Sequence, residues 1–403
     1  MKISIIQPSR NNLKYLKWSY DAIRKNQGQH TVEICVADDF SDKDGTWQWC
    51  QEMMQTDPHF KAIRNEGPSR LGHTILYDQL VNDVASHDIC MIYHADMYLC
   101  PGALDHIEQH VGAKKIVSLT RIEPPLHPPG PEKILLDCGI EPEEFDEDKL
   151  LHNIEMEYDI IYKDKITEGI FAPWAFMKAD FQEINGHDPL YAPQSKEDSD
   201  IFNRFQLNGV TFIQTWEGLV YHMTCRGSRF NPTLTTPGQN SPEWEAQNQK
   251  STRNFIRKWG HFCKHNEFMK PIIPPKYNIA FVVTNCNMSM LEVLEPWCDR
   301  IYIDDAMQVL TDSYIETEQV NTRFDLTKRV FCVGYNDPAG ENDIVVAIDG
   351  KNFTQTDFQY IQQLAEILQD SGQPGTFRLG NLQITIASLI ARESELIVCN
   401  RGI

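Results

Sequence analysis

Strand and helix patterns alternate through the first hundred residues, and this alternation constrains the fold more than any other feature of the chain. Short apolar runs at 3–6, 32–37 and 89–93 are typical of buried strands. Apolar residues at helical spacing fill the intervals, for example at 13–23 and 71–84. Such alternation predicts a mostly parallel sheet between layers of helices, in which ligands bind at the carboxyl ends of the strands.

Two polar clusters follow strands of this predicted sheet. Asp38 and Asp39 come directly after the strand at 32–37, and His94 and Asp96 follow the strand at 89–93. In an extended segment, residues i and i+2 point the same way, so His94 and Asp96 can face one ligand. A carboxylate there suits a divalent cation such as Mg²⁺ or Mn²⁺. Taken alone, each cluster is better explained as a polar turn or a helix cap.

Two more polar features lie further along the chain. The run Glu197-Asp198-Ser199-Asp200 opens an apolar helical stretch. Acids at a helix start are favoured by the helix dipole, but three acids in four residues exceed that need, so one of them is a candidate general base. His222 follows a short apolar strand, where a histidine is either structural or a metal ligand.

Length and composition bound the remaining possibilities. The 403 residues favour two domains, and the net charge of −20 works against diffuse binding to nucleic acid or anionic membranes. No apolar run approaches the roughly 18–20 residues of a transmembrane helix. The eleven cysteines lack C-x-x-C spacing, which favours free thiols and a cytoplasmic protein. We predict a first domain at 1–268, a proline-rich linker at 269–277 and a smaller α/β domain at 278–403.

The order of the four clusters resembles that of a family-2 glycosyltransferase with the GT-A fold, over roughly residues 1–230. VADDFSDKDGT resembles the nucleotide turn of that family, and NEGPSRLG is similar to a segment that carries an arginine, here Arg70. HAD stands in the place of the DxD motif, so Asp96 is retained while His94 replaces the first aspartate. FMKADFQEINGHD is similar to the acceptor-side stretch, and Glu197-Asp198 stands where the family keeps its catalytic pair, followed by Arg204.

This resemblance implies a GT-A domain with a Rossmann-like, mostly parallel sheet, followed by a smaller α/β domain. It implies an inverting transfer of sugar from a nucleotide-diphosphate sugar, most simply a UDP-sugar, to an acceptor hydroxyl. Asp198 would act as general base beside Glu197, and Asp96 and His222 would bind Mn²⁺ or Mg²⁺. The donor-binding residues would be Pro8, Ser9, Arg10, Asp38, Asp39, Arg70, His94 and Ala95.

The acceptor is less constrained by the sequence. Trp174 is either an acceptor-side platform or a core residue. The basic stretch at 225–270, with Arg226, Arg229, Arg253 and Arg257, forms either solvated helix faces or a patch for an anionic acceptor. DNA with hydroxymethylated bases, as modified in phages, is one such acceptor. A catalytically inactive nucleotide-sugar-binding protein remains the alternative. The second domain could bind the acceptor, brace the first domain or form a homodimer.

Overall fold

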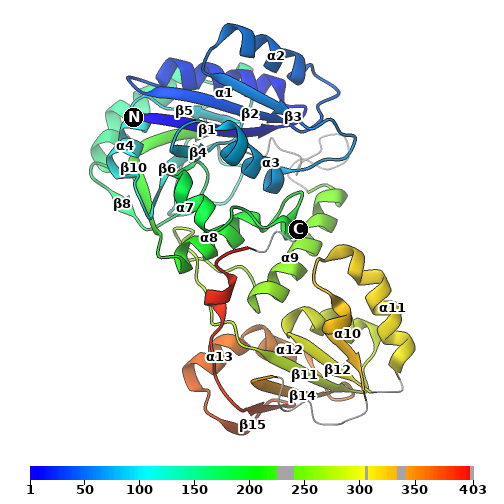
Figure 1. Ribbon diagram of the computed structural model, residues 1–403. Helices are drawn as coiled ribbons and strands as arrows, with labels where there is room; N and C mark the ends of the chain where they lie inside the picture. Colours follow the sequence, from blue (N-terminus) through cyan, green and yellow to red (C-terminus); the bar gives the residue numbers. More distant parts are fainter. Residues whose placement is uncertain (225–239, 305–306, 334–341, 400–403) are drawn as a thin grey trace. The chain divides into compact units, whose positions relative to one another are not determined.

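The computed structural model describes residues 1–403 except 225–239, 305–306, 334–341 and 400–403. The chain forms two compact units, which are considered separately (Figure 1). Unit 1 consists of Met1–Ala246, His265–Pro271 and Val398–Ile403, and unit 2 consists of Gln247–Lys264 and Ile272–Ile397.

Unit 1 is built around a ten-stranded sheet with the order β3-β2-β1-β4-β9-β6-β10-β5, in which β7 pairs with β6 and β8 with β10. Its strands are β1 (Lys2–Ser9), β2 (Thr31–Asp38), β3 (Phe60–Arg64), β4 (Ile89–Ile92), β5 (Met97–Leu99), β6 (Lys115–Glu123), β7 (Lys133–Leu135), β8 (Ile166–Thr167), β9 (Trp174–Met177) and β10 (Thr211–His222). Its helices are α1 (Leu13–Asn26), α2 (Thr46–Thr56), α3 (His73–Gln79), α4 (Ala103–His110), α5 (Glu147–Asn153), α6 (Asp159–Ile161), α7 (Lys178–Glu183) and α8 (Glu197–Leu207).

The first four strands pair in parallel, as the alternation of strand and helix patterns predicts. β1 and β2 are buried on both faces over nearly their whole length, which is why they read as continuous apolar runs. In Figure 1, α2 lies above β1–β3 and α3 lies below them. The sheet then becomes mixed, because β9 runs antiparallel to β4 and β6, and β5 runs antiparallel to β10.

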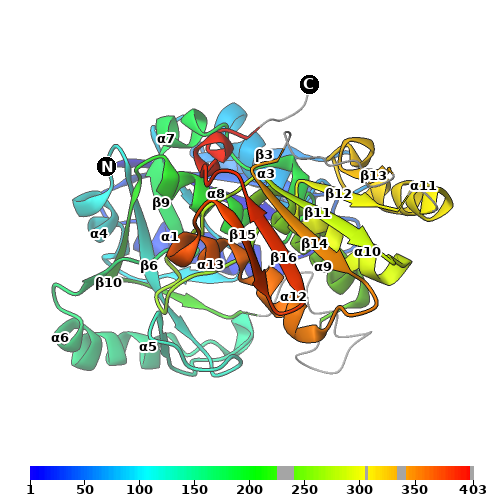
Figure 2. The same ribbon diagram turned by 90° about the horizontal axis from the view of Figure 1, so that it is seen from below.

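Unit 2 holds a second sheet of six strands, with the order β13-β12-β11-β14-β16-β15. β11 (Ile279–Thr284), β12 (Arg300–Ile303), β13 (Val330–Cys332) and β14 (Ile344–Asp349) are parallel, and β15 (Gly375–Leu379) and β16 (Leu382–Ile386) form an antiparallel edge (Figure 2). Its helices are α10 (Met288–Leu294), α11 (Gln308–Glu318), α12 (Gln355–Gln362) and α13 (Leu364–Ser371). The predicted smaller α/β domain is therefore present.

The division between the units falls earlier than the predicted linker at 269–277. α9 (Pro242–Trp259) belongs to unit 2 from Gln247 onward, while His265–Pro271 belongs to unit 1. The reason is that α9 buries Asn254, Phe255 and Ile256 and carries arginines whose carboxylate partners lie in unit 2. Proline content marked a break in regular structure there, but it did not mark the boundary between the two units.

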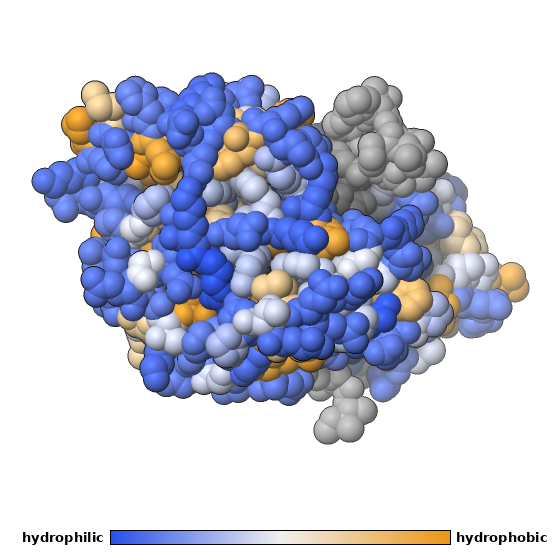
Figure 3. All heavy atoms as spheres, turned by 90° about the horizontal axis from the view of Figure 1, so that it is seen from above, coloured by the Kyte–Doolittle hydropathy of each residue, from blue (hydrophilic) through white to orange (hydrophobic). Residues whose placement is uncertain are grey.

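The surface and the helices add two observations. The face shown in Figure 3 is largely hydrophilic, with hydrophobic residues in small groups, in keeping with a net charge of −20. Among the described residues, no helix combines the length and the apolar character that crossing a membrane requires.

Candidate active site

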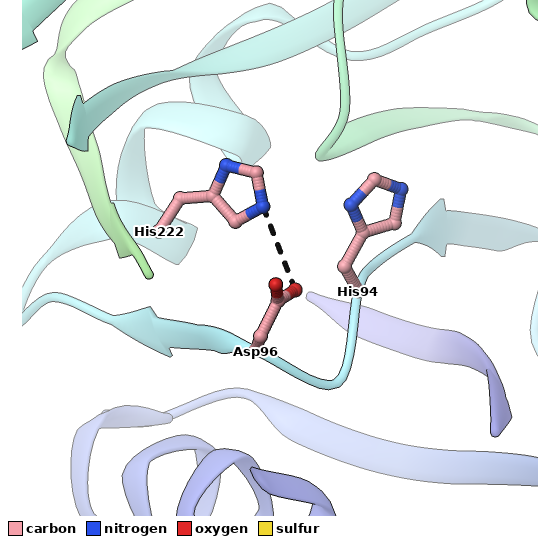
Figure 4. A group of neighbouring side chains, drawn as sticks. All are labelled: His94, Asp96 and His222. Atoms are coloured by element: carbon pink, nitrogen blue, oxygen red, sulfur yellow. Dashed lines mark ion pairs between the residues drawn. The ribbon is translucent and has the colours of Figure 1, made fainter. Parts of the chain in front are cut away.

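A cluster of two histidines and one aspartate lies where β4 and β10 end. His94 and Asp96 occupy the turn between β4 and β5, and His222 is the last residue of β10. Met97 pairs with His222 in the β5–β10 ladder, and the amide of Met223 donates to the carbonyl of Asp96 at 3.0 Å. This register brings His222 Nε2 to 3.5 Å from Asp96 Oδ1 (Figure 4).

The three side chains fit a divalent metal ion. One ligand atom from each of His94, Asp96 and His222 lies within 4.8 Å of the other two. Figure 4 shows the two imidazole rings on either side of the Asp96 carboxylate. Imidazole nitrogen and carboxylate oxygen are both ligands of divalent transition metals. The sequence prediction that Asp96 and His222 form a metal site is thus consistent with this geometry, which also brings in His94.

Glu123 is a member of this site that the sequence analysis missed. It ends β6, is only 2% exposed, and accepts a hydrogen bond from His222 Nδ1 at 2.9 Å. Arg121 Nη1 and Lys133 Nζ also pair with its carboxylate, at 2.9 and 3.0 Å. A charged residue at the end of a buried strand is the same signal that identified Asp38 and Asp96. Here it was obscured by the five-proline segment that begins immediately after it.

These contacts shift the ionisation of the cluster. Burial lowers the pKa of His94 to about 3, so its imidazole is neutral. Burial would also lower the pKa of His222, but the carboxylates of Asp96 and Glu123 outweigh it and raise the pKa to about 9. Burial opposes the charged form of Glu123, yet His222, Arg121 and Lys133 hold the pKa of its carboxyl well below the usual range. The cluster therefore contains two ionised carboxylates in a desolvated setting.

The predicted donor residues meet at the carboxyl ends of β1 and β2. Ser9 pairs with Asp38 in the parallel ladder, and the amide of Asp39 donates to the carbonyl of Ser9 at 2.9 Å. Pro8 is buried in β1, and Arg10 follows the strand. The hydroxyl of Ser9 and Nε of Arg10 are buried without a hydrogen-bond partner, as expected of groups that await a ligand.

Asp38 and Asp39 differ in how fully they are engaged. Both oxygens of Asp39 accept hydrogen bonds from the 65–72 loop: from Asn65 Nδ2 at 2.7 Å and from the amides of Leu71 and Gly72 at 2.9 and 3.0 Å. Arg70 Nε lies 3.7 Å from the same carboxylate. Asp38 accepts from the Ser41 amide, but its Oδ2 has no hydrogen bond and lies 3.3 Å from Arg64 Nε. Asp39 thus organises the loop, while Asp38 Oδ2 is buried beside Arg64 without a hydrogen bond.

The acidic run at 197–200 separates into two roles. Asp200 is buried against Arg204, with Oδ2 2.7 Å from Nε, so this pair is structural. Glu197 and Asp198 begin α8, and Oε2 of the buried Glu197 has no hydrogen-bond partner. Burial and the neighbouring Asp198 raise the pKa of Glu197 to about 8. Burial also raises the pKa of Asp198 above its ordinary value.

The separate clusters converge around the start of α3. Burial raises the pKa of Tyr77, and Asp198, Glu197 and Asp96 raise it further. Burial and Arg70 lower the pKa of His73 to about 4, while Asp39 and Asp96 act in the opposite direction. Two residues on one helix turn therefore lie in the fields of the metal cluster, the donor loop and the acidic pair. The sequence analysis assigned no role to either residue, because an aromatic residue and a histidine on an amphipathic helix look like core residues.

His187 is a second histidine that the sequence analysis did not single out. It is 1% exposed, its Nδ1 lies 2.7 Å from Asp78 Oδ1, and its ring stacks on Tyr77 with centroids 5.5 Å apart. Burial lowers its pKa to about 4, and the charge of Asp198 is the strongest influence that opposes this shift. The histidine of the NGHD segment therefore lies close enough to Asp198 to feel its charge.

The three acceptor-side predictions either need correction or fall outside the described residues. Trp174 is fully buried and packs against Phe176, Phe202 and Phe205, so it is a core residue and offers no face to an acceptor. Arg226 and Arg229 lie outside the described residues.

On α9, Arg253 and Arg257 form neither a solvated face nor an anion-binding patch. Arg257 is buried, pairs with Glu295 at 2.7 Å and also contacts Glu318. Arg253 pairs with Glu318 at 2.8 Å. A cavity of about 320 Å³ within unit 2 is lined in part by Arg257 and Arg329, and none of its lining residues belongs to the candidate site.

A mostly parallel sheet, with the cluster of His94, Asp96 and His222 and an acidic pair near one helix, is the arrangement expected of a GT-A-like domain. Residues 4–128 match the family model described as Glycosyl transferase family 2, which confirms the predicted resemblance over that segment. The match covers β1–β6, including the Asp38, Asp96 and Glu123 positions. No curated protein matches the chain.

Three solved structures are similar to the chain at low identity. One is GalNAc-T7 with UDP, GalNAc and Mn²⁺ (14% identity, 64% of this chain, 48% of that chain, TM-score 0.44). Another is the mannosyltransferase PcManGT from Pyrobaculum calidifontis with GDP-Man and Mn²⁺ (14% identity, 64% of this chain, 63% of that chain, TM-score 0.41). The third is TarS 1–349 from S. aureus (14% identity, 55% of this chain, 60% of that chain, TM-score 0.40). The chain thus spans 48% to 63% of the length of these proteins.

Proposed function

We propose that this chain is an inverting, metal-dependent glycosyltransferase that moves a sugar from a nucleotide-diphosphate sugar to an acceptor hydroxyl. The observation that carries this proposal is the grouping of three chemistries around α3: a metal-ligand trio, a nucleotide-type turn and a carboxyl pair of raised pKa. The family match over residues 4–128 supports the same activity. We take a UDP-sugar as the donor to be tested first.

The donor half of the reaction is assigned to the ends of β1 and β2. Asp38 Oδ2, which has no hydrogen bond, accepts from a base N–H or a ribose hydroxyl. Asp39 holds the 65–72 loop in place and thereby positions Arg70 beside the nucleotide. Ser9 and Arg10 supply further polar contacts from buried atoms that lack protein partners. His94 and Ala95 lie in the β4–β5 turn beside this region.

Asp96 and His222 would hold a Mn²⁺ or Mg²⁺ ion, which when bound supplies charge neutralisation for the departing diphosphate. The chain's own contribution is to fix both ligands before substrate arrives. Asp96 and His222 are tied to adjacent strands by backbone pairing, and Glu123 holds the far nitrogen of the His222 ring. Ligands fixed in this way need little reorganisation, which favours stabilisation of developing charge.

Asp198 is the proposed general base. A base must be ionised at the working pH and able to accept a proton from the attacking hydroxyl. The pKa of Glu197 is raised to about 8, so Glu197 is largely protonated at neutral pH and leaves Asp198 as the ionised member of the pair. Desolvation raises the pKa of Asp198, which strengthens it as a base relative to a carboxylate in water.

The described residues favour no particular class of acceptor. Arg253 and Arg257 are engaged in carboxylate pairs, so they give no support to a DNA acceptor. The alternative function, a nucleotide-sugar-binding protein without turnover, makes the same prediction for donor binding. It differs in the outcome of a substitution at Asp198.

The test combines binding with turnover. Calorimetric titration of UDP, GDP and dTDP, with Mn²⁺ and with EDTA, should show metal-dependent binding of one nucleotide. The matching nucleotide sugars are then assayed for release of that nucleotide, with water as a slow acceptor. Asp198→Asn should lower this rate by roughly 10²–10⁴-fold and leave donor affinity nearly unchanged. Asp21→Asn, at an exposed aspartate on α1, is the matched control. Absence of binding to all three nucleotides would contradict the proposal, and binding without any release would favour the inactive alternative.

A further inference from the structure

We infer that His94 is a third protein ligand of the metal and that the resulting site selects a transition-metal ion over Mg²⁺. This inference rests on the proposed function, because it concerns the metal site of the same reaction. It goes further in assigning a role to the histidine that replaces the first aspartate of the motif. It also names the chemical class of ion that the site takes: Mn²⁺, Co²⁺ or Zn²⁺, which imidazole suits better than it suits Mg²⁺.

The geometry places a ring nitrogen of His94 where it can bind the ion. One of its ring nitrogens lies within 4.8 Å of the ligand atoms of Asp96 and His222. The two imidazole rings have centroids 5.7 Å apart and are tilted by 58°, so they face a common space and do not stack (Figure 4). Among the contacts of the described residues, only the backbone carbonyl of His94 takes part in a hydrogen bond. Its ring nitrogens therefore remain available to an ion.

Glu123 fixes which nitrogen of His222 faces that space. A carboxylate can only accept a hydrogen bond, so His222 Nδ1 carries the proton that Glu123 receives at 2.9 Å. Nε2 is then the nitrogen on the side of Asp96. Arg121 and Lys133 hold the Glu123 carboxylate in turn. Such partners behind a metal-binding histidine orient the ring and increase its basicity.

The ligand set determines the preference among ions. Mg²⁺ favours oxygen ligands and retains most of its water, whereas transition-metal ions accept imidazole nitrogen more readily, with Co²⁺ above Mn²⁺ in the usual order of affinity. His94, Asp96 and His222 offer two nitrogens and one carboxylate. An aspartate in place of His94 would replace a nitrogen by an oxygen and add a negative charge. Three protein ligands also allow an ion to bind before the nucleotide arrives.

The test is metal binding to the full chain without nucleotide. Mn²⁺, Co²⁺ and Mg²⁺ are titrated by calorimetry, and bound Co²⁺ is followed by its visible absorption. We expect Mn²⁺ to bind at least about tenfold more tightly than Mg²⁺, and the Co²⁺ spectrum to report nitrogen ligation. His94→Asp should lower the ratio of Mn²⁺ affinity to Mg²⁺ affinity, or bring it below one. Glu123→Gln should weaken Mn²⁺ binding by roughly 10–100-fold. His59→Gln, at an exposed histidine, is the matched control.

The outcomes separate this inference from the proposed function. Equal affinity for Mg²⁺ and Mn²⁺, no binding of Mn²⁺ or Co²⁺ without nucleotide, or a Co²⁺ spectrum unchanged in His94→Asp would each overturn the inference. Thermal unfolding of each variant shows whether it folds, and if His94→Asp does not, His94→Gln provides the same comparison. UDP, GDP and dTDP are titrated in the same preparation. Metal selectivity without nucleotide binding would sustain the inference and contradict the proposed function. Nucleotide binding without metal selectivity would sustain the proposed function and contradict the inference.

Discussion

Replacing Glu295 by glutamine should destabilise unit 2 strongly at neutral pH. Glu295 is fully buried and accepts hydrogen bonds from Arg257, Arg329 and the hydroxyl of Tyr314. Glutamine keeps the shape of the side chain but removes the charge that both guanidinium groups face. Arg257 would retain Glu318, while the buried charge of Arg329 would face the neutral glutamine oxygen and two backbone carbonyls in place of a carboxylate.

The magnitude follows from two independent estimates. Burial alone would raise the pKa of Glu295, but Arg329 and Arg257 outweigh it and lower the pKa from 4.5 to about 2. A shift of that size corresponds to roughly 3 kcal/mol in favour of the ionised folded state. Removing one partner of a buried ion pair typically costs about 3–5 kcal/mol. We therefore expect the loss for Glu295→Gln to be about 3–5 kcal/mol at pH 7.

The sign of the pH dependence provides a stricter check. Because the pKa is depressed on folding, the stabilisation is fully present above the unfolded value of 4.5 and is lost as the pH falls toward about 2. The difference between wild type and variant should shrink over the same interval. Hydrogen exchange of β12 and β13, read by mass spectrometry, reports unit 2 specifically. A difference below about 1 kcal/mol at pH 7, or one that does not change on acidification, would refute the reasoning.

Two further predictions concern unit 1. Asp39→Ala leaves the amides of Leu71 and Gly72 without their acceptor, which should cost about 1–3 kcal/mol of stability for each unsatisfied group. Hydrogen exchange in 65–72 should rise and nucleotide affinity should fall. Unchanged exchange would contradict this role of Asp39. The acid limb of the pH profile of turnover should lie above the ordinary aspartate range, because burial raises the pKa of Asp198. Glu197→Gln should leave that limb in place, because Glu197, with a pKa of about 8, is already protonated at that pH. A limb that moves downward in Glu197→Gln would show that Glu197 is charged at the pH of the assay.

The sequence sufficed for those parts of the fold that depend on local patterns. Strands at 3–6, 32–37 and 89–93 were predicted because both faces are buried and the apolar run is unbroken. Asp38 and Asp96 were found by the same logic, as polar residues at the ends of such runs. The antiparallel strands β5 and β9 were not predicted, because their partners lie far away in sequence and strand pairing leaves little trace in composition.

The misses in the site have a common physical cause, which is that long-range partners determine what a side chain does. Trp174 is a residue type that can stack on a sugar, but it packs into an aromatic cluster formed by α8 and β9. Arg257 looks like a solvent-exposed cation on a helix until Glu295, 38 residues further along, is placed against it. Glu123 and His222 are separated by 99 residues, so only the sheet reveals their hydrogen bond.

The strand order explains why the metal cluster is fixed in place. β10 lies between β6 and β5, and His222 is at its end. The neighbour on one side supplies Glu123 to Nδ1 of His222, and the turn before the neighbour on the other side supplies Asp96 to Nε2. Side chains alternate between the faces of a sheet, so a slip of one residue in β10 would turn the His222 ring away from both partners. The position of this ring is therefore set by backbone pairing along β10.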